Sequence, residues 1–354
     1  MFKPVFTITP EINSRIAEIE RLKALASQAV ILPEIEVRMR FRASVESTHS
    51  STSIEGNPLT SPEVQKVLKG EKITAPAYAI TEVLNYKKAL NWIHASKKSG
   101  LETTSKDVLR LHHIVASGLL SKTKTGHWRP GVVYIVDEVD GNEIIQYVGP
   151  DAKKVPKLVT SLLKWIPLQL SERLHPVLLA GLIHYLFISI HPFSDGNGRV
   201  TRLLVYKYLR EWGFDFRESI SLDTYYLLHQ NEYYEALSLG NTFDSRMEAN
   251  ITPFLDFFTK GFLEVATNLN QHIVVAKSLN SDLPLRLSPE EFSILEYAHQ
   301  FNSITITEAA EILRTSKRTS LRLLQKLVQK NILSSIGRGP ATRYVLVSNL
   351  ENSG

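Results

Sequence analysis

Pro176–Ile190 (PVLLAGLIHYLFISI) and the stretch that follows it, His191–Arg202 (HPFSDGNGRVTR), decide the fold of this chain. The first stretch is apolar on nearly every side, which is typical of a helix buried in the middle of a bundle. The second begins as a short polar loop, and a new helix is expected to start near Arg199. We therefore predict a mainly α-helical protein with a polar loop between two central helices.

The composition of this loop suits phosphate binding. Gly196 and Gly198 carry no side chain, so backbone N–H groups can approach a ligand closely. These donors lie at a helix N-terminus, where the helix dipole also favours an anion. Arg199 and Arg202, in the first turn of the helix, add guanidinium groups that match phosphate oxygens.

Two more side chains extend the chemistry of the loop. Asp195 supplies one hard oxygen ligand, which is what a phosphate-bound Mg²⁺ usually takes from a protein. His191 can accept a proton near neutral pH, so it is a candidate base for an attacking hydroxyl. A base, a metal ligand, an anion site and two arginines within twelve positions predict phosphoryl or nucleotidyl transfer.

The segment resembles the signature of the Fic family, His-Pro-Phe-x-(Asp or Glu)-Gly-Asn-Gly-Arg-x-x-Arg, at every fixed position. The resemblance implies a helical core that binds ATP with Mg²⁺ and transfers AMP to Ser, Thr or Tyr hydroxyls of target proteins. It implies His191 as the base, Asp195 as the metal ligand, Gly196, Asn197 and Gly198 as contacts of the α- and β-phosphates, and Arg199 and Arg202 as contacts of the outer phosphates. Family members that act as kinases depart from the Gly-Asn-Gly part, which is intact here and favours AMP transfer.

A β-hairpin is predicted after the segment Thr125–Arg129. Its strands are Val132–Val136 and Ile144–Val148, around the turn Asp140–Asn142. The hairpin resembles the flap of the Fic family, which holds the extended backbone of the target as an added strand beside the active site. An ordinary surface hairpin is the alternative.

The spacing of Tyr234, Leu237 and Asn241 resembles the adenosine-binding helix of the family. The resemblance implies that Tyr234 and Leu237 flank the base and that Asn241 hydrogen-bonds to it. Aromatic and leucine residues at helical spacing also fit a role in the core of the bundle.

Ser51–Gly56 (STSIEG) lies at the end of a second long helix, predicted over 34–53. Glu55 is then a carboxylate at a helix C-terminus, where the dipole disfavours negative charge, so a positive partner is expected. The segment resembles the inhibitory motif of the family, (Ser or Thr)-x-x-x-Glu-(Gly or Asn). The resemblance implies that Glu55 pairs with Arg202 in the space of the γ-phosphate, and that Ser51 helps to orient Glu55. We therefore expect an auto-inhibited resting state.

The chain divides into four predicted regions. Residues 1–110 form an N-terminal helical region with the inhibitory helix, and 111–267 form the Fic catalytic core. Residues 268–284 form the linker between the two domains, either a connecting helix or an irregular segment. Residues 285–354 read as two helices around a turn, then two strands, with a helix start before them at Ser288. This order is typical of a winged helix-turn-helix domain.

The composition sets further limits on function. The chain has 354 residues, 43% of them hydrophobic, a formal net charge of +5 and no cysteine. Disulfides, thiolate zinc sites and cysteine nucleophiles are therefore excluded. The first nine residues do not resemble a secretory signal, and the most apolar stretch is too short to span a bilayer. These features predict a cytoplasmic protein with no membrane partner.

The predicted partners are ATP, Mg²⁺ and a protein with a Ser, Thr or Tyr hydroxyl. DNA is an alternative partner of the winged helix, because Arg318 and Arg322 lie on its presumed recognition helix. A DNA-binding regulator that uses the Fic core as a nucleotide sensor is therefore an alternative function. A different nucleotide donor, or removal of AMP, is another, and a homodimer that holds the inhibitory helix closed is also left open.

Overall fold

The computed structural model describes residues 2–96, 103–139, 142–278, 287–337 and 342–347. Within these ranges the chain is mainly helical, as predicted, with two small antiparallel sheets. The helices are α1 (Pro10–Gln28), α2 (Pro33–Ser53), α3 (Ser61–Leu68), α4 (Ala77–Ala95), α5 (Ser105–Ala116), α6 (Val155–Ser171), α7 (Pro176–Ile190), α8 (Asn197–Glu211), α9 (Leu222–Leu228), α10 (Gln230–Leu237), α11 (Phe243–Glu248), α12 (Thr252–Ser278), α13 (Pro289–Gln300), α14 (Ile306–Leu313) and α15 (Lys317–Gln329). The strands are β1 (Tyr134–Val139), β2 (Asn142–Val148), β3 (Leu333–Ile336) and β4 (Arg343–Leu346), and short 3-10 turns are η1 (Ala152–Lys154) and η2 (Phe216–Glu218).

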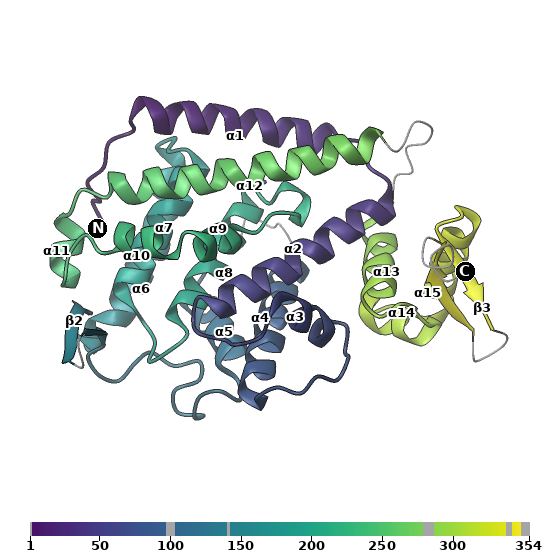
Figure 1. Ribbon diagram of the computed structural model, residues 1–354, viewed down its shortest axis with the longest axis horizontal. Coiled ribbons are helices and arrows are strands. Elements are labelled where there is room, and N and C mark those ends of the chain that lie inside the picture. Colours follow the sequence, from purple (N-terminus) through teal and green to yellow (C-terminus); the bar gives the residue numbers. More distant parts are fainter. Residues whose placement is uncertain (1, 97–102, 140–141, 279–286, 338–341, 348–354) are drawn as a thin grey trace.

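The helix α7 forms the centre of the larger part of the molecule. Every residue from 177 to 190 is buried, in agreement with the apolar character of this stretch on all sides. It packs against α6, α8 and α12, while α1 lies alongside α12 at one edge of the molecule (Figure 1). Each large aliphatic side chain buried in this way contributes roughly 1.5–3 kcal/mol. The C-terminal end of α7, where the predicted catalytic loop begins, is therefore held firmly.

The predicted hairpin is present as β1 and β2, which pair antiparallel along their length. Residues 140–141 of its predicted turn lie outside the described residues. The buried Tyr147 donates its hydroxyl to the carbonyl of Ser189, in the last turn of α7. At the same end, the N–H of Val148 donates to the carbonyl of Asn241 over 2.8 Å. The hairpin is thus attached beside the loop that follows α7.

The helices and strands at the C-terminal end form a separate module with its own hydrophobic cluster. The hydroxyl of Ser288 accepts from the N–H of Glu291, and the Glu291 carboxylate accepts from the N–H of Ser288, so the predicted cap of α13 is present. The helix predicted over Lys317–Gln329 is α15, and β3 and β4 pair antiparallel after it. The name winged helix for this module stays a prediction.

One predicted boundary differs from the structure, because α5 runs across the position after residue 110. Of the two alternatives for the linker over 268–284, the described part is a connecting helix as far as Ser278, because apolar side chains continue at helical spacing: Leu269 and Ile273 are buried in the main core. Residues 279–284 lie outside the described residues. In the described part of the chain, no helix is long and apolar enough to cross a membrane.

The helix α2 contacts both parts of the molecule (Figure 1). Near its start, the fully buried Val37 belongs to the same hydrophobic cluster as Ile294 and Leu295 of α13. Near its end, α2 is rich in buried serine and threonine. The hydroxyls of Thr48 and Thr52 donate to carbonyls one turn earlier, over 2.7 and 2.8 Å, so these polar side chains are satisfied within the helix.

Candidate active site

The loop between α7 and α8 is fixed by its own hydrogen bonds. His191 ends α7 in the left-handed region, with φ 49°, and Gly196 precedes α8 with φ 77°. The side chain of Asn197 closes the loop, since it accepts from the N–H and donates to the carbonyl of Phe193, both over 2.8 Å. Because this amide is used within the loop, the backbone N–H is the group of Asn197 that is left for a phosphate.

The predicted base, His191, is partly exposed at the end of α7. Burial lowers the pKa of its imidazole to about 4, so the ring is neutral at neutral pH. A neutral imidazole can accept a proton from a hydroxyl. The backbone carbonyl of His191 accepts from Nε of Arg129 over 2.8 Å, which ties this residue to the segment before the hairpin. The backbone of His191 is thus held in place, and its imidazole is in the protonation state that a base requires.

The carboxylate of Glu55 lies at the N-terminal turn of α8. A Cβ built on Gly198 would collide with this carboxylate and would lie 3.0 Å from Nη1 of Arg202. Only glycine therefore leaves room for an anion at this position. The first-turn N–H groups of a helix have no partner within the helix, so a negative charge here is stabilised by them and by the dipole. The place predicted to bind phosphate is next to a carboxylate of the protein.

Arg202, which is 4% exposed, makes the ion pair with Glu55 that we expected. Its Nη2 lies 2.8 Å from Oε1 of Glu55, and its Nε lies 3.1 Å from Oδ1 of Asp223. Although burial alone lowers the pKa of this guanidinium, the charges of Glu55 and Asp223 raise it above its usual value. Ser51 was expected to orient Glu55, but its hydroxyl and its carbonyl both accept from Arg202, over 2.7 and 2.8 Å. Ser51 thus positions the arginine.

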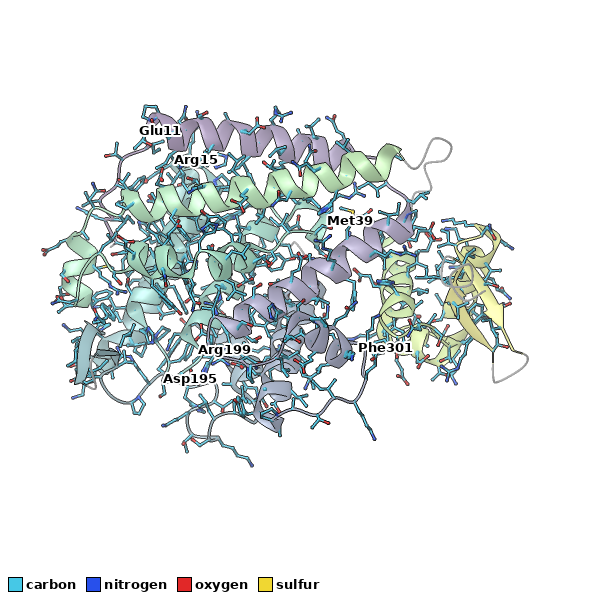
Figure 2. The ribbon with its side chains drawn as sticks, viewed as in Figure 1. Glu11, Arg15, Met39, Asp195, Arg199 and Phe301 are labelled. Atoms are coloured by element: carbon cyan, nitrogen blue, oxygen red, sulfur yellow. The ribbon has the colours of Figure 1, made fainter. Side chains whose placement is uncertain are left out.

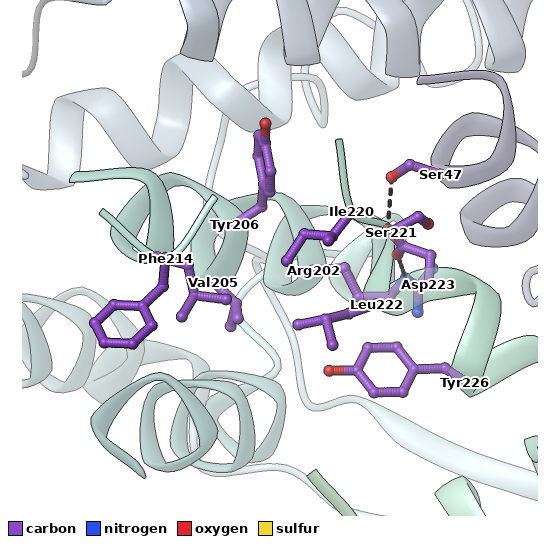
Figure 3. A pocket seen from close by; sticks show the side chains of 11 residues that line it. Ser47, Arg202, Val205, Tyr206, Phe214, Ile220, Ser221, Leu222, Asp223 and Tyr226 are labelled. Atoms are coloured by element: carbon purple, nitrogen blue, oxygen red, sulfur yellow. Dashed lines mark hydrogen bonds and ion pairs between the residues drawn. The ribbon is translucent and has the colours of Figure 1, made fainter. Parts of the chain in front are cut away.

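Asp223 accepts a hydrogen bond from α2. The hydroxyl of Ser47, one turn before Ser51, donates to Oδ2 of Asp223 over 2.7 Å, and Figure 3 shows this bond beside the Asp223–Arg202 ion pair. The same groups line a cavity of about 20 Å³, which is large enough for one water molecule. The helix α2 therefore holds Arg202 directly and also through Asp223.

The first arginine of the signature, Arg199, has carboxylate partners of its own. It forms a buried ion pair with Glu82, and its Nη2 lies 3.3 Å from Oδ1 of Asp195. Figure 2 shows Asp195 and Arg199 close together at the start of α8. Glu82 also accepts from Nδ2 of Asn57 over 2.6 Å. Arg199 thus connects α8 to α4, and its predicted contact with the outer phosphates stays a prediction.

The predicted metal ligand, Asp195, has a side chain that is 55% exposed. Its Oδ1 accepts from the N–H of Gly196 over 2.5 Å, within the loop. The described part of the chain contains no cluster of three or more side chains that could hold a metal ion. A single exposed carboxylate beside a phosphate-binding turn fits Mg²⁺, which is commonly held by one or two carboxylates together with phosphate oxygens.

The three residues predicted to bind adenosine lie in different surroundings. Tyr234 on α10 is 46% exposed, and its hydroxyl donates to the carbonyl of Ile54 over 3.3 Å, next to Glu55. Leu237 is 7% exposed and belongs to the main core, so most of its side chain packs inside the helical bundle. Asn241 contacts the hairpin through its carbonyl. Their roles in binding a nucleotide stay predictions.

Four residues that support the loop were not predicted: Glu82, His112, Arg129 and Asp223. The ring of His112 stacks on Phe193 with 3.8 Å between centroids, and its Nε2 donates to the carbonyl of Asp195 over 3.2 Å. Only Arg129 had a signal, because it lies in the segment quoted before the hairpin. The others come from helices with ordinary amphipathic patterns.

Residues 102–209 match the family model described as the Fic/DOC family. The chain is 27% identical to the protein adenylyltransferase Fic of Drosophila yakuba over 279 residues, which are 78% of this chain and 51% of the relative. It is 28% identical to the protein of the same name from Drosophila grimshawi over 256 residues, which are 72% of this chain and 48% of the relative. The chain thus spans about half the length of these curated relatives.

Two solved bacterial structures have the same fold. A Fic family protein from Desulfovibrio desulfuricans G20 is 25% identical, with a TM-score of 0.64 and 98% coverage of both chains. A Fic domain-containing signaling protein from Bacteroides thetaiotaomicron is 24% identical, with a TM-score of 0.61 over 77% of this chain and 100% of that chain. The first match includes almost the whole chain, so it extends into the C-terminal module.

Proposed function

We propose that this chain, which contains a Fic domain over residues 102–209, transfers AMP from ATP to a Ser, Thr or Tyr hydroxyl of a target protein. The main support is the loop between α7 and α8, where neutral His191 stands at one end and a helix N-terminus with Arg202 at the other. The relatives named protein adenylyltransferase Fic support the same reaction. We infer the cytoplasm as its location.

In the proposed reaction the hydroxyl oxygen of the target attacks the α-phosphorus of ATP. His191 accepts the hydroxyl proton, the bond between the α-phosphorus and the bridging oxygen breaks, and pyrophosphate leaves with the electron pair. Negative charge then builds on the transferring and leaving oxygens. The first-turn N–H groups of α8 and the guanidinium of Arg202 stabilise that charge. Donors fixed before the reaction need no reorganisation during it, which is why a rigid loop suits this role.

Asp195 is the residue that would hold Mg²⁺, together with phosphate oxygens of the nucleotide. When bound, the ion neutralises phosphate charge. Arg199 keeps α8 in place through Glu82 and, through Asp195, keeps the carboxylate near the loop. Arg199 therefore affects the proposed metal site indirectly, by positioning Asp195.

We infer that Glu55 inhibits the resting enzyme. Its carboxylate holds Arg202 and lies over Gly198, where the proposed reaction needs a phosphate. Two anions this close repel each other, by about 4 kcal/mol for unit charges 4 Å apart near a protein surface. ATP therefore binds productively only after Glu55 moves. The contact of Tyr234 with Ile54 means that this movement also exposes α10, the proposed adenosine-binding helix.

The alternative of a DNA-linked nucleotide sensor has one specific observation in its favour. Lys317, Arg318 and Arg322 of α15 are exposed. Lys326 and Lys330, further along the same segment, instead pair with Glu291, at 2.9 and 3.1 Å. A gel shift that weakens with salt and disappears in Arg318→Gln with Arg322→Gln would favour this reading.

The proposed function is tested with ATP labelled at the α-phosphate. The native chain, Glu55→Gly, and Glu55→Gly with His191→Ala are incubated with Mg²⁺ and the label. We expect label on the Glu55→Gly protein, weak label on the native chain and none on the double variant. If no variant is labelled although ATP binds, the AMP-transfer proposal for ATP fails, and another donor, removal of AMP or the sensor becomes the better reading.

A further inference from the structure

A second cavity, of about 1250 Å³, lies between the larger part of the molecule and the C-terminal module. Its walls come from the ends of α1 and α8, from α2 and α4, from η2, and from α13 with the residues before it. None of the residues of the loop at 191–202 lines it. Cavities between two parts of a chain are common ligand sites, because both parts can contribute contacts.

Most of the charged side chains in this cavity neutralise one another. Arg40 pairs with Glu36 and with Glu218, both at 3.2 Å. Arg210 pairs with Glu218 at 3.1 Å, and Arg217 pairs with Glu36. This network joins α2 to the end of α8 and to η2. Its charges are matched within the protein and need no ligand.

Lys87, on α4, differs from these residues. Its Nζ donates to the hydroxyl of Ser44 over 2.7 Å, and among the described residues no carboxylate lies within ion-pair distance of it. Burial lowers the pKa of this ammonium, although the more distant charges of Glu296 and Glu218 raise it. Lys87 is half-buried, and an ammonium that is partly removed from water is stabilised by an anionic partner, because the loss of hydration is otherwise uncompensated.

We propose that this cavity binds a small molecule whose phosphate or carboxylate group pairs with Lys87. Aromatic side chains line the same cavity, namely Phe41 of α2 and Phe292 and Tyr297 of α13, so the remainder of the ligand is expected to be partly apolar. Because α4, α2 and α13 all contribute, the bound molecule holds the C-terminal module and the larger part in one arrangement.

One face of α2 connects this cavity to the active site. Ser44, Ser47 and Ser51 follow each other at spacings of three and four, so they lie on the same side of the helix. Ser44 accepts from Lys87, Ser47 donates to Asp223, and Ser51 accepts from Arg202. The distance along the helix from Ser44 to Ser51 is about 10 Å, at about 1.5 Å per residue.

Binding in the cavity is therefore communicated to Glu55 through α2, and this part of the inference rests on the proposed function. An anion that draws Nζ of Lys87 away from Ser44 removes a hydrogen bond between α4 and α2. The helix is then held less firmly against Arg202, and Glu55 leaves more readily. By linkage, the ligand raises the affinity for ATP and ATP raises the affinity for the ligand by the same factor.

The site is tested by titrating the full chain calorimetrically with inorganic phosphate and, separately, with citrate. The chains are native, Lys87→Gln, Lys87→Arg and, as a matched control, Lys88→Gln, which changes the exposed neighbouring lysine. We expect at least a tenfold loss of affinity in Lys87→Gln only, and the probe that binds more tightly identifies the anionic group. Equal affinity in Lys87→Gln and the native chain, or no binding of either probe, overturns the proposal. Binding of a probe at the loop of 191–202 would not be weakened by Lys87→Gln. Such a result would therefore also count against the proposal.

The coupling is tested by measuring the affinity for ATP with and without a saturating concentration of the tighter probe. We expect at least a threefold gain in the native chain and no gain in Glu55→Gly, where the inhibitory carboxylate is absent. An unchanged affinity in the native chain overturns the coupling. Both experiments measure binding and do not depend on AMP transfer. If the chain transfers no AMP, the proposed function is refuted, and the two binding results still decide whether the cavity binds an anion and whether it is coupled to ATP.

Discussion

Arg202 and Lys87 are two cations that contact the same face of α2, and their partners differ. Arg202 has two carboxylates, those of Glu55 and Asp223. Lys87 has the hydroxyl of Ser44. At the proposed active site the protein supplies its own anion, so on our proposal ATP must displace Glu55 before it can bind. In the cavity near the C-terminal module the proposed ligand would supply the anion, since the nearest carboxylates, those of Glu296 and Glu218, act on Lys87 only from a distance.

The comparison also explains the unusual composition of α2. A helix with one apolar face would bury only aliphatic side chains, but the second half of α2 buries serine and threonine. Ser44 and Ser51 accept from cations on neighbouring helices without adding charge, while Thr48 and Thr52 bond within α2. This part of the helix therefore contacts its neighbours through hydroxyl groups as well as through apolar packing.

The largest effect is expected from the base. In a Glu55→Gly background, His191→Ala should lower the rate of AMP transfer by about 10²–10⁴-fold, the usual contribution of a positioned acid or base. The affinity for ATP should stay within about twofold, because no binding role for the imidazole is proposed. Single-turnover labelling and equilibrium binding measure the two quantities.

The control for this variant is His175→Ala, which alters the other His-Pro pair of the chain. His175 caps α7 by accepting from the N–H of Val177 over 3.2 Å, so its loss should cost about 1 kcal/mol of stability and leave transfer unchanged. Equal losses of transfer in the two variants would show that His191 acts through the structure of α7.

A smaller effect is expected from the charge of Glu55 alone. Glu55→Gln keeps the size of the side chain and removes the anion that competes with phosphate. A hydrogen bond to a charged group contributes about 1.5–3 kcal/mol, so the affinity for ATP should rise about 10-fold or more. Glu46→Gln is the matched control, since Glu46 lies on the same helix but pairs with the exposed Arg42. A gain of similar size in the control would refute an inhibitory role that is specific to Glu55.

The positions of helices were predictable because the signals are local. Caps and periodicity gave α15 with its observed ends, and the capping box at Ser288 gave the start of α13. The ion pair of Glu55 with Arg202 joins residues 147 positions apart, and it was expected only because both residues belong to motifs of one family. Motifs thus carried long-range information that composition and periodicity do not contain.

Contacts between residues outside any motif could not be predicted. Glu82 pairs with Arg199 across 117 positions, yet it lies on an ordinary helix and no neighbouring residue marks it. The continuation of α12 as far as Ser278 has a different cause. The polar residues after 267 left a helix or an irregular segment open, and burial of Leu269 and Ile273 against the main core favours the helix.

The pH dependence of AMP transfer tests whether the pKa of His191 is lowered. Burial lowers the pKa of His191 to about 4, although the negative charge of Glu55 acts in the opposite direction. In Glu55→Gly the rate of transfer should therefore change less than about twofold between pH 8 and pH 5. A histidine with the ordinary pKa of about 6.5 would lose about 30-fold over the same range.

The lowered pKa of His191 also determines how the stability of the folded chain changes with pH. The pKa of His191 is lower in the folded chain than in the unfolded chain, so its contribution to stability is complete above about pH 6.5 and declines as the pH falls towards 4. Urea unfolding of the native chain and of His191→Ala, at pH 7 and pH 5, measures this. A smaller difference in stability between pH 7 and pH 5 is expected for the variant than for the native chain, and equal differences would contradict the shifted pKa.

The smallest effect is expected at the start of α2, and it tests whether the C-terminal module is attached to this helix. Val37→Ala removes two methyl groups from the cluster that Val37 shares with Ile294 and Leu295, at a cost of about 1.5 kcal/mol. Amide hydrogens of α13 should then exchange roughly tenfold faster. Val45→Ala is the matched control, because Val45 lies in a different cluster with Val64 of α3. If exchange in α13 stays at its native rate in Val37→Ala, the module does not hold α2, and a ligand in the cavity cannot act on Glu55 through that contact.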